Sequence, residues 1–165
     1  MSENLNHHAS LEGKYLTFKL QSEAYGIDVL KVREIIRLTN VTTVPQLPDY
    51  VRGVINLRGK IIPVIDLRAR FDFVIAENTS QTCIIVVQVK LAEGKAAAMG
   101  LVVDGVEEVT HITAGEIEET PEFGGQIYTD YILGIAKVRG QVKALLDIDK
   151  TINDRVAAGP LAALA

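Results

Sequence analysis

Side chains that carry covalent or metal chemistry are scarce in this sequence. Its 165 residues include one cysteine, three histidines and no tryptophan. A single cysteine cannot form a disulfide within the chain, which is typical of a reducing compartment. Two of the histidines, His7 and His8, lie in the polar N-terminal segment, and His111 stands alone. Without a group of ligands at metal-binding spacing, zinc chemistry and most hydrolytic chemistry are excluded.

Motifs that bind nucleotides or perform catalysis are also missing. The sequence contains no GxxxxGK[ST], GxGxxG, HExxH or GxSxG, so phosphate-loop, dinucleotide, metalloprotease and hydrolase sites lack their essential parts. Asp147 and Asp149 resemble the start of a calcium loop, but the required glycine at position six and glutamate at position twelve are absent. We therefore expect no catalytic residue, cofactor or metal site.

A basic excess and long apolar runs are absent as well. Seventeen Lys and Arg face 21 Asp and Glu, for a net charge of −4, which argues against a nucleic-acid binder. The longest strongly apolar run, residues 83–87, is far shorter than the roughly 20 residues that cross a bilayer. The N-terminus also lacks the basic and apolar regions of a signal peptide. These features predict a cytoplasmic protein without direct membrane insertion.

What the sequence does contain is aliphatic side chains in short runs, since 48% of residues are hydrophobic but only 5% are aromatic. Residues 51–57 and 61–67 read as two strands joined by a hairpin turn at Arg58-Gly59-Lys60. Asp28 is placed to cap a short helix that carries Val29, Val32 and Ile36 on one face. Further strands are expected near 15–20, 25–27, 82–90, 97–103, 105–111, 131–138 and 142–147, and a last helix from Asp147 or Asp149 through Val156. The chain is therefore predicted to be mostly β.

The second half of the sequence repeats the first. Residues 53–67 align with 134–148, and Gly, Arg, Gly and Asp recur in register; residues 26–35 align in the same way with 100–109. The offsets of 81 and 74 residues differ, as expected when loops change length. The repeat predicts two related small β-barrels, at about 15–75 and 82–150. A disordered tail over 1–14 and a C-terminal tail over 156–165 would flank them.

Three charged features allow more than one interpretation. The acidic clusters at 107–108 and 116–119 could form a solvated face or a surface that binds another protein. An enzyme site built on these carboxylates is a further alternative, but the sequence places no second catalytic group beside them. Arg58 lies at a bend among aliphatic residues, a composition typical of a protein-binding groove, although an isolated arginine is more often a solvated turn residue. A nucleic-acid-binding barrel would need a basic groove with stacking aromatics, which the composition does not favour.

Several motifs together resemble the CheW family of chemotaxis coupling proteins. They are YGIDVLKVREI at 25–35, GVINLRG at 53–59, PVIDLR at 63–68, GLVVDGV at 100–106, PEF at 121–123 and YILG at 131–134. The likeness covers about residues 15–150, with the motifs in family order. It implies two intertwined five-stranded barrels of the SH3/OB-like kind that exchange strands, with one or two short helices and no catalysis.

The resemblance also implies a function and a site. Members of the family are cytoplasmic adaptors that join the signalling tip of methyl-accepting chemoreceptors to the histidine kinase CheA. The regulatory domain of that kinase resembles the family and can alternate with it in rings, where the adaptor could also contact itself. The positions that match the receptor-binding groove are Val32, Glu34, Asn56, Leu57, Arg58 and Gly59. We expect Arg58 and Glu34 to lie close enough to orient one another.

Two points stay open at the level of sequence. The Arg-Gly pair recurs at Arg139-Gly140, and the resemblance assigns no role to Arg139. Within the family, the sequence could represent a unit of the kinase or of a receiver-linked coupling protein. Its span from Met1 to Ala165 leaves no room for such a partner domain, which favours a stand-alone adaptor.

Overall fold

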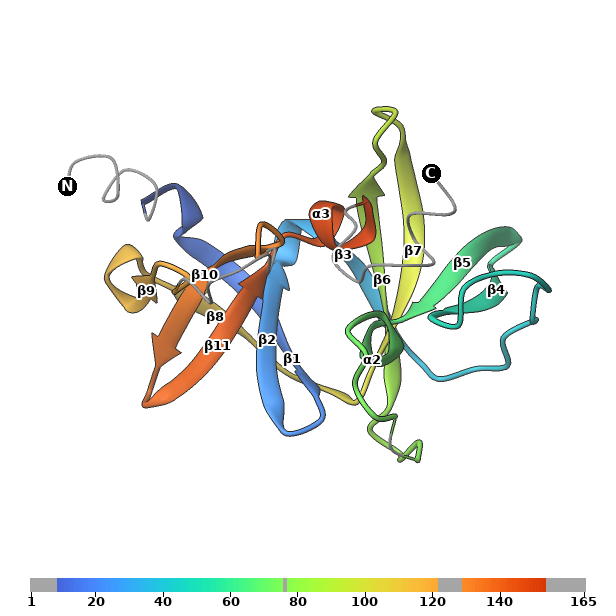
Figure 1. Ribbon diagram of the computed structural model, residues 1–165, viewed down its shortest axis with the longest axis horizontal. Helices are drawn as coiled ribbons and strands as arrows, with labels where there is room; N and C mark the ends of the chain where they lie inside the picture. The colour runs from blue at the N-terminus through green and yellow to red at the C-terminus, as the bar shows by residue number, and fades with distance from the viewer. Residues whose placement is uncertain (1–8, 76, 122–128, 154–165) are drawn as a thin grey trace.

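The computed structural model describes residues 9–75, 77–121 and 129–153, and it confirms the mostly β prediction (Figure 1). These residues form the strands β1 (Gly13–Leu20), β2 (Glu23–Asp28), β3 (Val32–Arg37), β4 (Val51–Leu57), β5 (Lys60–Asp66), β6 (Cys83–Lys90), β7 (Ala96–Val103), β8 (Gly105–Ile112), β9 (Ile117–Glu118), β10 (Ile132–Val138) and β11 (Gln141–Leu146). The helices are short: η1 (Val29–Lys31), α2 (Leu67–Arg70), η2 (Ala114–Glu116) and α3 (Ile148–Asn153). The tail expected at 156–165 and the first part of the tail expected at 1–14, residues 1–8, lie outside the described residues. The prediction of disorder is wrong for residues 9–14, which form a helical turn at 9–11 and the start of β1.

The strands form two sheets that exchange hairpins between the two halves of the chain. One sheet has the order β3-β6-β7-β5-β4 and the other β8-β1-β2-β11-β10-β9. The β1–β2 hairpin thus joins strands of the second half, and the β6–β7 hairpin joins strands of the first (Figure 1). A parallel pairing attaches each exchanged hairpin to its host sheet, β2 to β11 and β7 to β5. The intertwined architecture implied by the resemblance is therefore confirmed.

Each sheet closes on itself by the same device. After β3 the chain returns to β4, where the backbones of Thr42 and Val54 exchange two hydrogen bonds of 2.9 Å. After β8 the two-residue strand β9 pairs with β10, with Ile117 opposite Ala136. The strand β9 follows β8 in the chain and pairs at the opposite edge of the same sheet. This sixth strand closes the sheet into a barrel, and the other five strands are arranged as in the five-stranded sheet. We call the two units the five-stranded barrel and the six-stranded barrel.

Three apolar cores explain why the strands read as continuous aliphatic runs. In β6, Ile84 and Val86 point into the five-stranded barrel, whereas Ile85 and Val87 enter a core between the barrels. Both faces of the strand are buried, so the alternation of apolar and polar residues is lost. The core between the barrels draws from both sheets and both longer helices, including Leu16, Phe18, Leu20, Leu67, Leu101, Leu146 and Ile148.

The segment after β2 differs from its prediction. Asp28 does cap a helix, since its carboxylate accepts a hydrogen bond from the backbone of Leu30 at 2.9 Å, but η1 ends at Lys31. Residues 32–37 form β3, in which half-buried and exposed residues alternate. The spacing of Val32 and Ile36 fits one face of a helix, but the helix prediction is wrong for these residues. Both side chains are β-branched, and such side chains favour a half-buried strand. At the N-terminus, β1 begins at Gly13 and Leu11 packs on the core of the six-stranded barrel.

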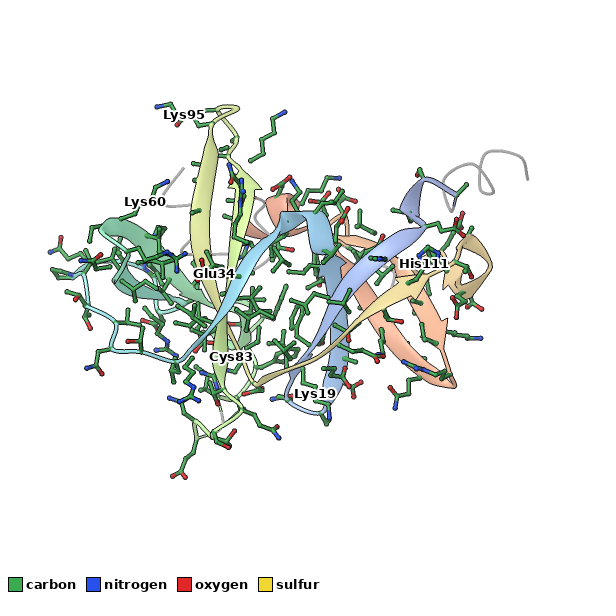
Figure 2. The ribbon with its side chains drawn as sticks, turned by 180° about the vertical axis from the view of Figure 1, so that it is seen from behind. Lys19, Glu34, Lys60, Cys83, Lys95 and His111 are labelled. Carbon is green, nitrogen blue, oxygen red and sulfur yellow. The ribbon has the colours of Figure 1, made fainter. Side chains whose placement is uncertain are left out.

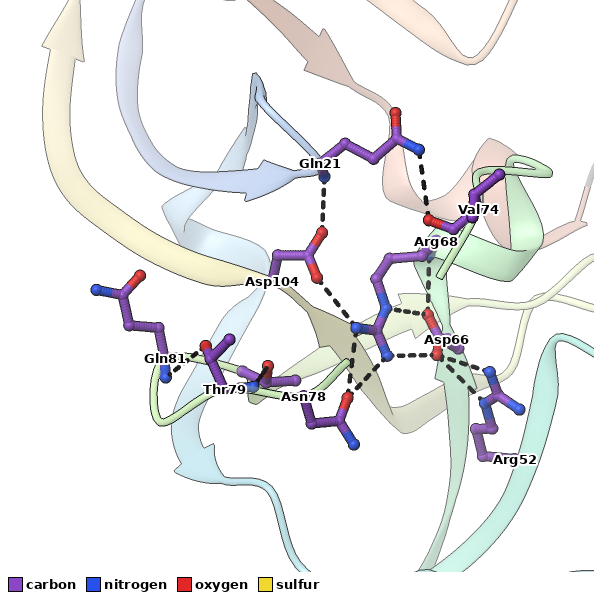
Figure 3. Close-up of polar contacts among 10 residues, drawn as sticks. Gln21, Arg52, Asp66, Arg68, Val74, Asn78, Thr79, Gln81 and Asp104 are labelled. Atoms are coloured by element: carbon purple, nitrogen blue, oxygen red, sulfur yellow. Dashed lines mark hydrogen bonds and ion pairs between the residues drawn. The ribbon is translucent and has the colours of Figure 1, made fainter. Parts of the chain in front are cut away.

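A buried ionic network joins the two barrels on one side (Figure 3). Arg68, 3% exposed, donates hydrogen bonds to both carboxylate oxygens of Asp66 and to Asp104 at the β7–β8 junction, all between 2.8 and 3.0 Å. Asp104 in turn accepts from the backbone of Gln21 in the β1–β2 turn at 2.6 Å. Burial would raise the pKa of Asp66, but the hydrogen bonds and charges of Arg68 and Arg52 outweigh it and lower that pKa.

Helix α3 makes the corresponding contact on the other side with the charges reversed. Asp149 accepts from Lys31 at 2.7 Å and from the backbone of Lys90 at 2.8 Å. The amide of Asn153 donates to the carbonyl of Lys90 at 2.8 Å. Each contact begins at a helix that follows a hairpin, α2 after β4–β5 and α3 after β10–β11. It reaches a segment that links the two barrels, at Asp104 or Lys31, and a hairpin exchanged between them, β1–β2 or β6–β7. The relative position of the barrels is thus fixed at two ends.

Candidate functional site

The β4–β5 hairpin of the five-stranded barrel is built around a tight turn. Arg58 and Gly59 have φ values of 52° and 86°, the positive pair that two-residue hairpins require. The side-chain oxygen of Asn56 accepts a hydrogen bond from the Gly59 backbone at 2.8 Å, and Leu57 packs on the barrel core. Asn56, Leu57 and Gly59 therefore hold the turn in shape, and Arg58 is presented at its tip with 71% of its side chain exposed.

Arg58 reaches across the end of the barrel to Glu34 on β3, whose position on the ribbon Figure 2 shows. Its Nη1 donates to Oε1 of Glu34 at 3.0 Å, and its Nη2 donates to Oε2. A two-point pair of this kind fixes the orientation of both groups. The hydrogen bonds from Arg58 lower the pKa of Glu34, and those to Glu34 raise the pKa of Arg58. The expectation that these residues orient one another is confirmed.

Val32 has a different environment from the other predicted site residues. The β3–β6 register shifts between Val32 and Glu34, and the half-buried Val32 packs on the core between the barrels. Its neighbour on the strand, Glu34, faces Arg58 instead. The structure thus brings Glu34, Asn56, Leu57, Arg58 and Gly59 together at the barrel end, whereas Val32 anchors the start of β3 next to the seam between the barrels.

The other barrel repeats this ion pair. Arg139 and Gly140 turn the β10–β11 hairpin with φ values of 51° and 78°, and Nη2 of Arg139 donates to Oε1 of Glu108 on β8. Arg139 aligns with Arg58 and Glu108 with Glu34 in the two sequence repeats. Each alignment can be read from the sequence, Arg139 with Arg58 at an offset of 81 residues and Glu108 with Glu34 at an offset of 74. Because the two offsets differ, the sequence does not show that Arg139 and Glu108 lie next to each other.

The chemistry available at both barrel ends is that of binding. Among residues 9–75, 77–121 and 129–153 no group of three or more His, Cys, Asp or Glu could hold a metal ion. Burial raises the pKa of the half-buried Cys83 thiol, which opposes formation of a reactive thiolate. Within the same residues, no helix has the length and apolar character needed to cross a membrane. An ion pair on an aliphatic barrel can position a partner but provides no nucleophile.

Comparison with known proteins places the chain. The family model for the CheW-like domain matches residues 14–156. The chain belongs to the CheW-like family. It is 39% identical over 140 residues to the chemotaxis protein CheW of Klebsiella aerogenes, a match that covers 85% of this chain and 81% of the relative. The CheW of Bacillus subtilis is 36% identical over 135 residues, with 82% and 81% covered.

A solved structure of the CheW-like family has the same fold. The crystal structure of the scaffolding protein TtCheW from Thermoanaerobacter tengcongensis matches with a TM-score of 0.73 and 33% identity. That match covers 90% of this chain and 97% of the other. The family consists of scaffolding adaptors and is not catalytic, so the chain is a chemotaxis adaptor and not an enzyme, as the sequence predicted.

Proposed function

We propose that this CheW-like chain couples the signalling tip of methyl-accepting chemoreceptors to the histidine kinase CheA, and that the Arg58–Glu34 end of the five-stranded barrel faces the receptor. The observation that carries the site is the two-point ion pair at an exposed hairpin tip. It fixes a cation at a defined place without burying it, so the outer side of the guanidinium is free for a partner. The proposed site residues at this end are Glu34, Asn56, Leu57, Arg58 and Gly59, and Val32 would take part from the start of β3 next to the seam between the barrels.

The surroundings of the pair suit a helical partner. Ile35, 45% exposed on β3, and Ile61, 61% exposed on β5, add apolar surface to the strands that carry the pair. Helices dock by burying an apolar face in a groove, and a placed arginine adds direction. The rigid turn reduces the ordering cost on binding. Affinity at one such site is moderate, and in an array many linked contacts would strengthen it.

The kinase regulatory domain would contact other barrel ends, and rings with the kinase or with further copies follow from the same proposal. The protein would be cytoplasmic and recruited to membrane-associated receptor arrays through its partners. Neither nucleic acid nor direct membrane insertion has a part in this function.

Reconstitution with CheA and receptor cytoplasmic fragments tests the coupling role. We expect kinase activity to become receptor-dependent only when this protein is added. The variant R58E should weaken receptor capture by roughly tenfold, the size of loss typical of an arginine anchor, because a second carboxylate would then face Glu34. Kinase activity that ignores the receptor with the wild-type protein present would refute the adaptor role.

R139E is the matched control, since Arg139 occupies the same turn geometry in the other barrel. Receptor capture by R139E should stay close to wild type. Thermal unfolding of both variants should change little, because exposed ion pairs contribute little to stability. Equal loss of capture in both variants, or a large drop in the unfolding midpoint of R58E, would count against Arg58 as the receptor-facing residue.

A further inference from the structure

Neither half of the chain can complete a barrel with its own hairpin. In the five-stranded barrel β3 is parallel to β7, and β6 lies between them. If β1 and β2 stood in place of β6 and β7, the three residues of η1 would have to join two parallel strands, a connection that needs about a dozen residues. In the other half, Asp104 alone separates β7 from β8. Each half therefore needs a hairpin from another half, and both linkers run from one barrel into the other (Figure 1).

A second copy of the chain could also supply that hairpin. The first half comprises β1 to β5 with α2, and the second half comprises β6 to β11 with α3. Because the halves are repeats, two first halves from different copies could exchange hairpins with each other, and so could two second halves. Short linkers between exchanged elements favour domain swapping of this kind. We call it like-with-like exchange, in contrast to the exchange between unlike halves in the structure.

An ion pair between a helix and a linker follows each parallel pairing of strands. β5 pairs with β7, and just beyond them Arg68 of α2 donates to Asp104 in the second linker at 3.0 Å. β11 pairs with β2, and just beyond them Lys31 in the first linker donates to Asp149 of α3 at 2.7 Å. In these two helix–linker pairs, the first half of the chain contributes both cations and the second half both anions.

The two parallel pairings have the same register. Ile65 of β5 lies opposite Leu101 of β7, and Leu146 of β11 lies opposite Ile27 of β2. Ile65 aligns with Leu146 in the sequence repeats, and Ile27 aligns with Leu101. A hairpin taken from the wrong half would therefore enter the barrel in the same register, and its linker would meet the helix at the same place.

Like-with-like exchange would bring equal charges together at that place. Two first halves would put Arg68 of one copy beside Lys31 of the other. Two second halves would put Asp149 of one copy beside Asp104 of the other. Arg68 is buried and would keep its contact with Asp66, but a second cation in place of an anion beside a buried guanidinium is costly.

We propose that the opposite charges of the two helix–linker pairs determine which hairpin each barrel accepts, and that they reject a second copy of the chain as its source. The short linkers make exchange obligatory, and the charges select the unlike half. The pattern works because each half carries one sign at both of its positions, so unlike halves attract and like halves repel. This role does not depend on the receptor-coupling proposal.

Refolding of the full chain at high protein concentration, followed by size-exclusion chromatography with light scattering, tests this selection. The wild type should be monomeric. K31D/D104K makes both helix–linker pairs repulsive in the monomer and attractive in the like-with-like dimer, so the ratio of dimer to monomer should rise roughly tenfold or more. K31N/D104N is the matched control, because it removes the same ion pairs without creating new ones, and it should stay monomeric. Equal ratios in the two variants would overturn the selection by charge.

A second variant keeps the test decisive if K31D/D104K does not fold. K31D/D149K reverses the more exposed pair, so every helix–linker pair joins opposite charges both in the monomer and in the like-with-like dimer. Its unfolding midpoint should stay close to that of the wild type, whereas its dimer fraction should rise with protein concentration during refolding. A chain that stays monomeric would show that linkage of the two halves is sufficient and would overturn the proposal.

Isotope-filtered NMR identifies the hairpin that has moved in the dimer. Labelled and unlabelled copies of the variant are refolded together, and contacts between copies are recorded. Like-with-like exchange should place Ile27 of one copy beside Ile65 of the other. Contacts of Ile27 with Leu146 of the other copy would show exchange between unlike halves, and contacts with neither would show association without exchange; both results count against the proposal.

Discussion

The two barrel ends share an ion pair and differ in what lies beneath it. Arg58 with Glu34 and Arg139 with Glu108 are held by hairpin turns of nearly equal backbone geometry. Under the first pair the barrel is filled by an isoleucine, and under the second by Lys143. Among the described residues no salt bridge joins the first pair to the barrel interior, whereas Glu108 also forms a salt bridge with the buried Lys143.

This difference shows how one duplicated element can acquire two roles. A pair that rests on aliphatic side chains exchanges partners at little cost to the fold, because exposed ion pairs contribute little to stability. A carboxylate that also compensates a buried cation cannot be removed so freely, because an uncompensated buried charge is costly. The five-stranded barrel end is thus suited to reversible contact through its arginine, whereas the ion pair of the other end is tied to the buried Lys143.

The largest difference between the barrels should appear where each closes. Gly53 has φ 139°, and a Cβ there would lie 1.9 Å from the carbonyl oxygen of Thr42. At the equivalent Gly134, which has no positive φ, the nearest atoms would be Cγ2 of Ile117 at 2.9 Å and the carbonyl oxygen of Glu118 at 3.2 Å, so a smaller shift relieves the contact than at Gly53. G53A should lower the free energy of unfolding by about 4 kcal/mol and G134A by about 1 kcal/mol. Urea denaturation measures both, and equal losses would show that the closures are equivalent.

Exchanging the residues beneath the ion pairs should have the next largest effect. I62K places a lysine in the aliphatic end of the five-stranded barrel and should cost about 3 kcal/mol. Lys143 faces the carboxylates of Glu107 and Glu108, whereas the equivalent positions of the five-stranded barrel hold Arg33 and Glu34, and Glu34 is already paired with Arg58. K143I introduces the residue of the other barrel and should change stability by less than about 1 kcal/mol, since a buried ionic group can often be replaced by an apolar one. A K143I loss as large as that of I62K would mean that Lys143 is structural.

The smallest effect concerns the protonation of Glu34. Its pKa in the folded chain is lowered by Arg58, so the stabilisation from the pair is present above the ordinary glutamate pKa and is lost as pH falls through the lowered value. R58Q should return the pKa of Glu34 towards its ordinary value. A carbon-detected NMR titration of the Glu34 carboxylate in both proteins measures this change. An unchanged pKa in R58Q would show that the pair does not persist in solution.

Much of the local structure could be predicted because it depends on neighbouring residues. The hairpin at Arg58-Gly59 follows from turn residues between two aliphatic runs, and β4 has the bounds that the pattern predicts. The helix expected after Asp28 was correct only for its first turn, because the same aliphatic spacing fits a strand once β6 is available as a partner. The site at Glu34 and Arg58 came from family resemblance, and Lys143 had no signal other than its alignment with Ile62.

The sequence by itself determined the kind of protein: an aliphatic, duplicated β chain without the groups that catalysis needs. Strand alternation and turn residues act over a few positions, so they can be read without a fold. Only the tertiary structure decided which hairpin joins which sheet. Apolar strands that are buried on both faces have similar compositions, so the sequence does not show which strand lies beside which. That choice brings Arg139 to Glu108 and leaves Lys143 beneath them, so the second barrel end is a product of the long-range pairing.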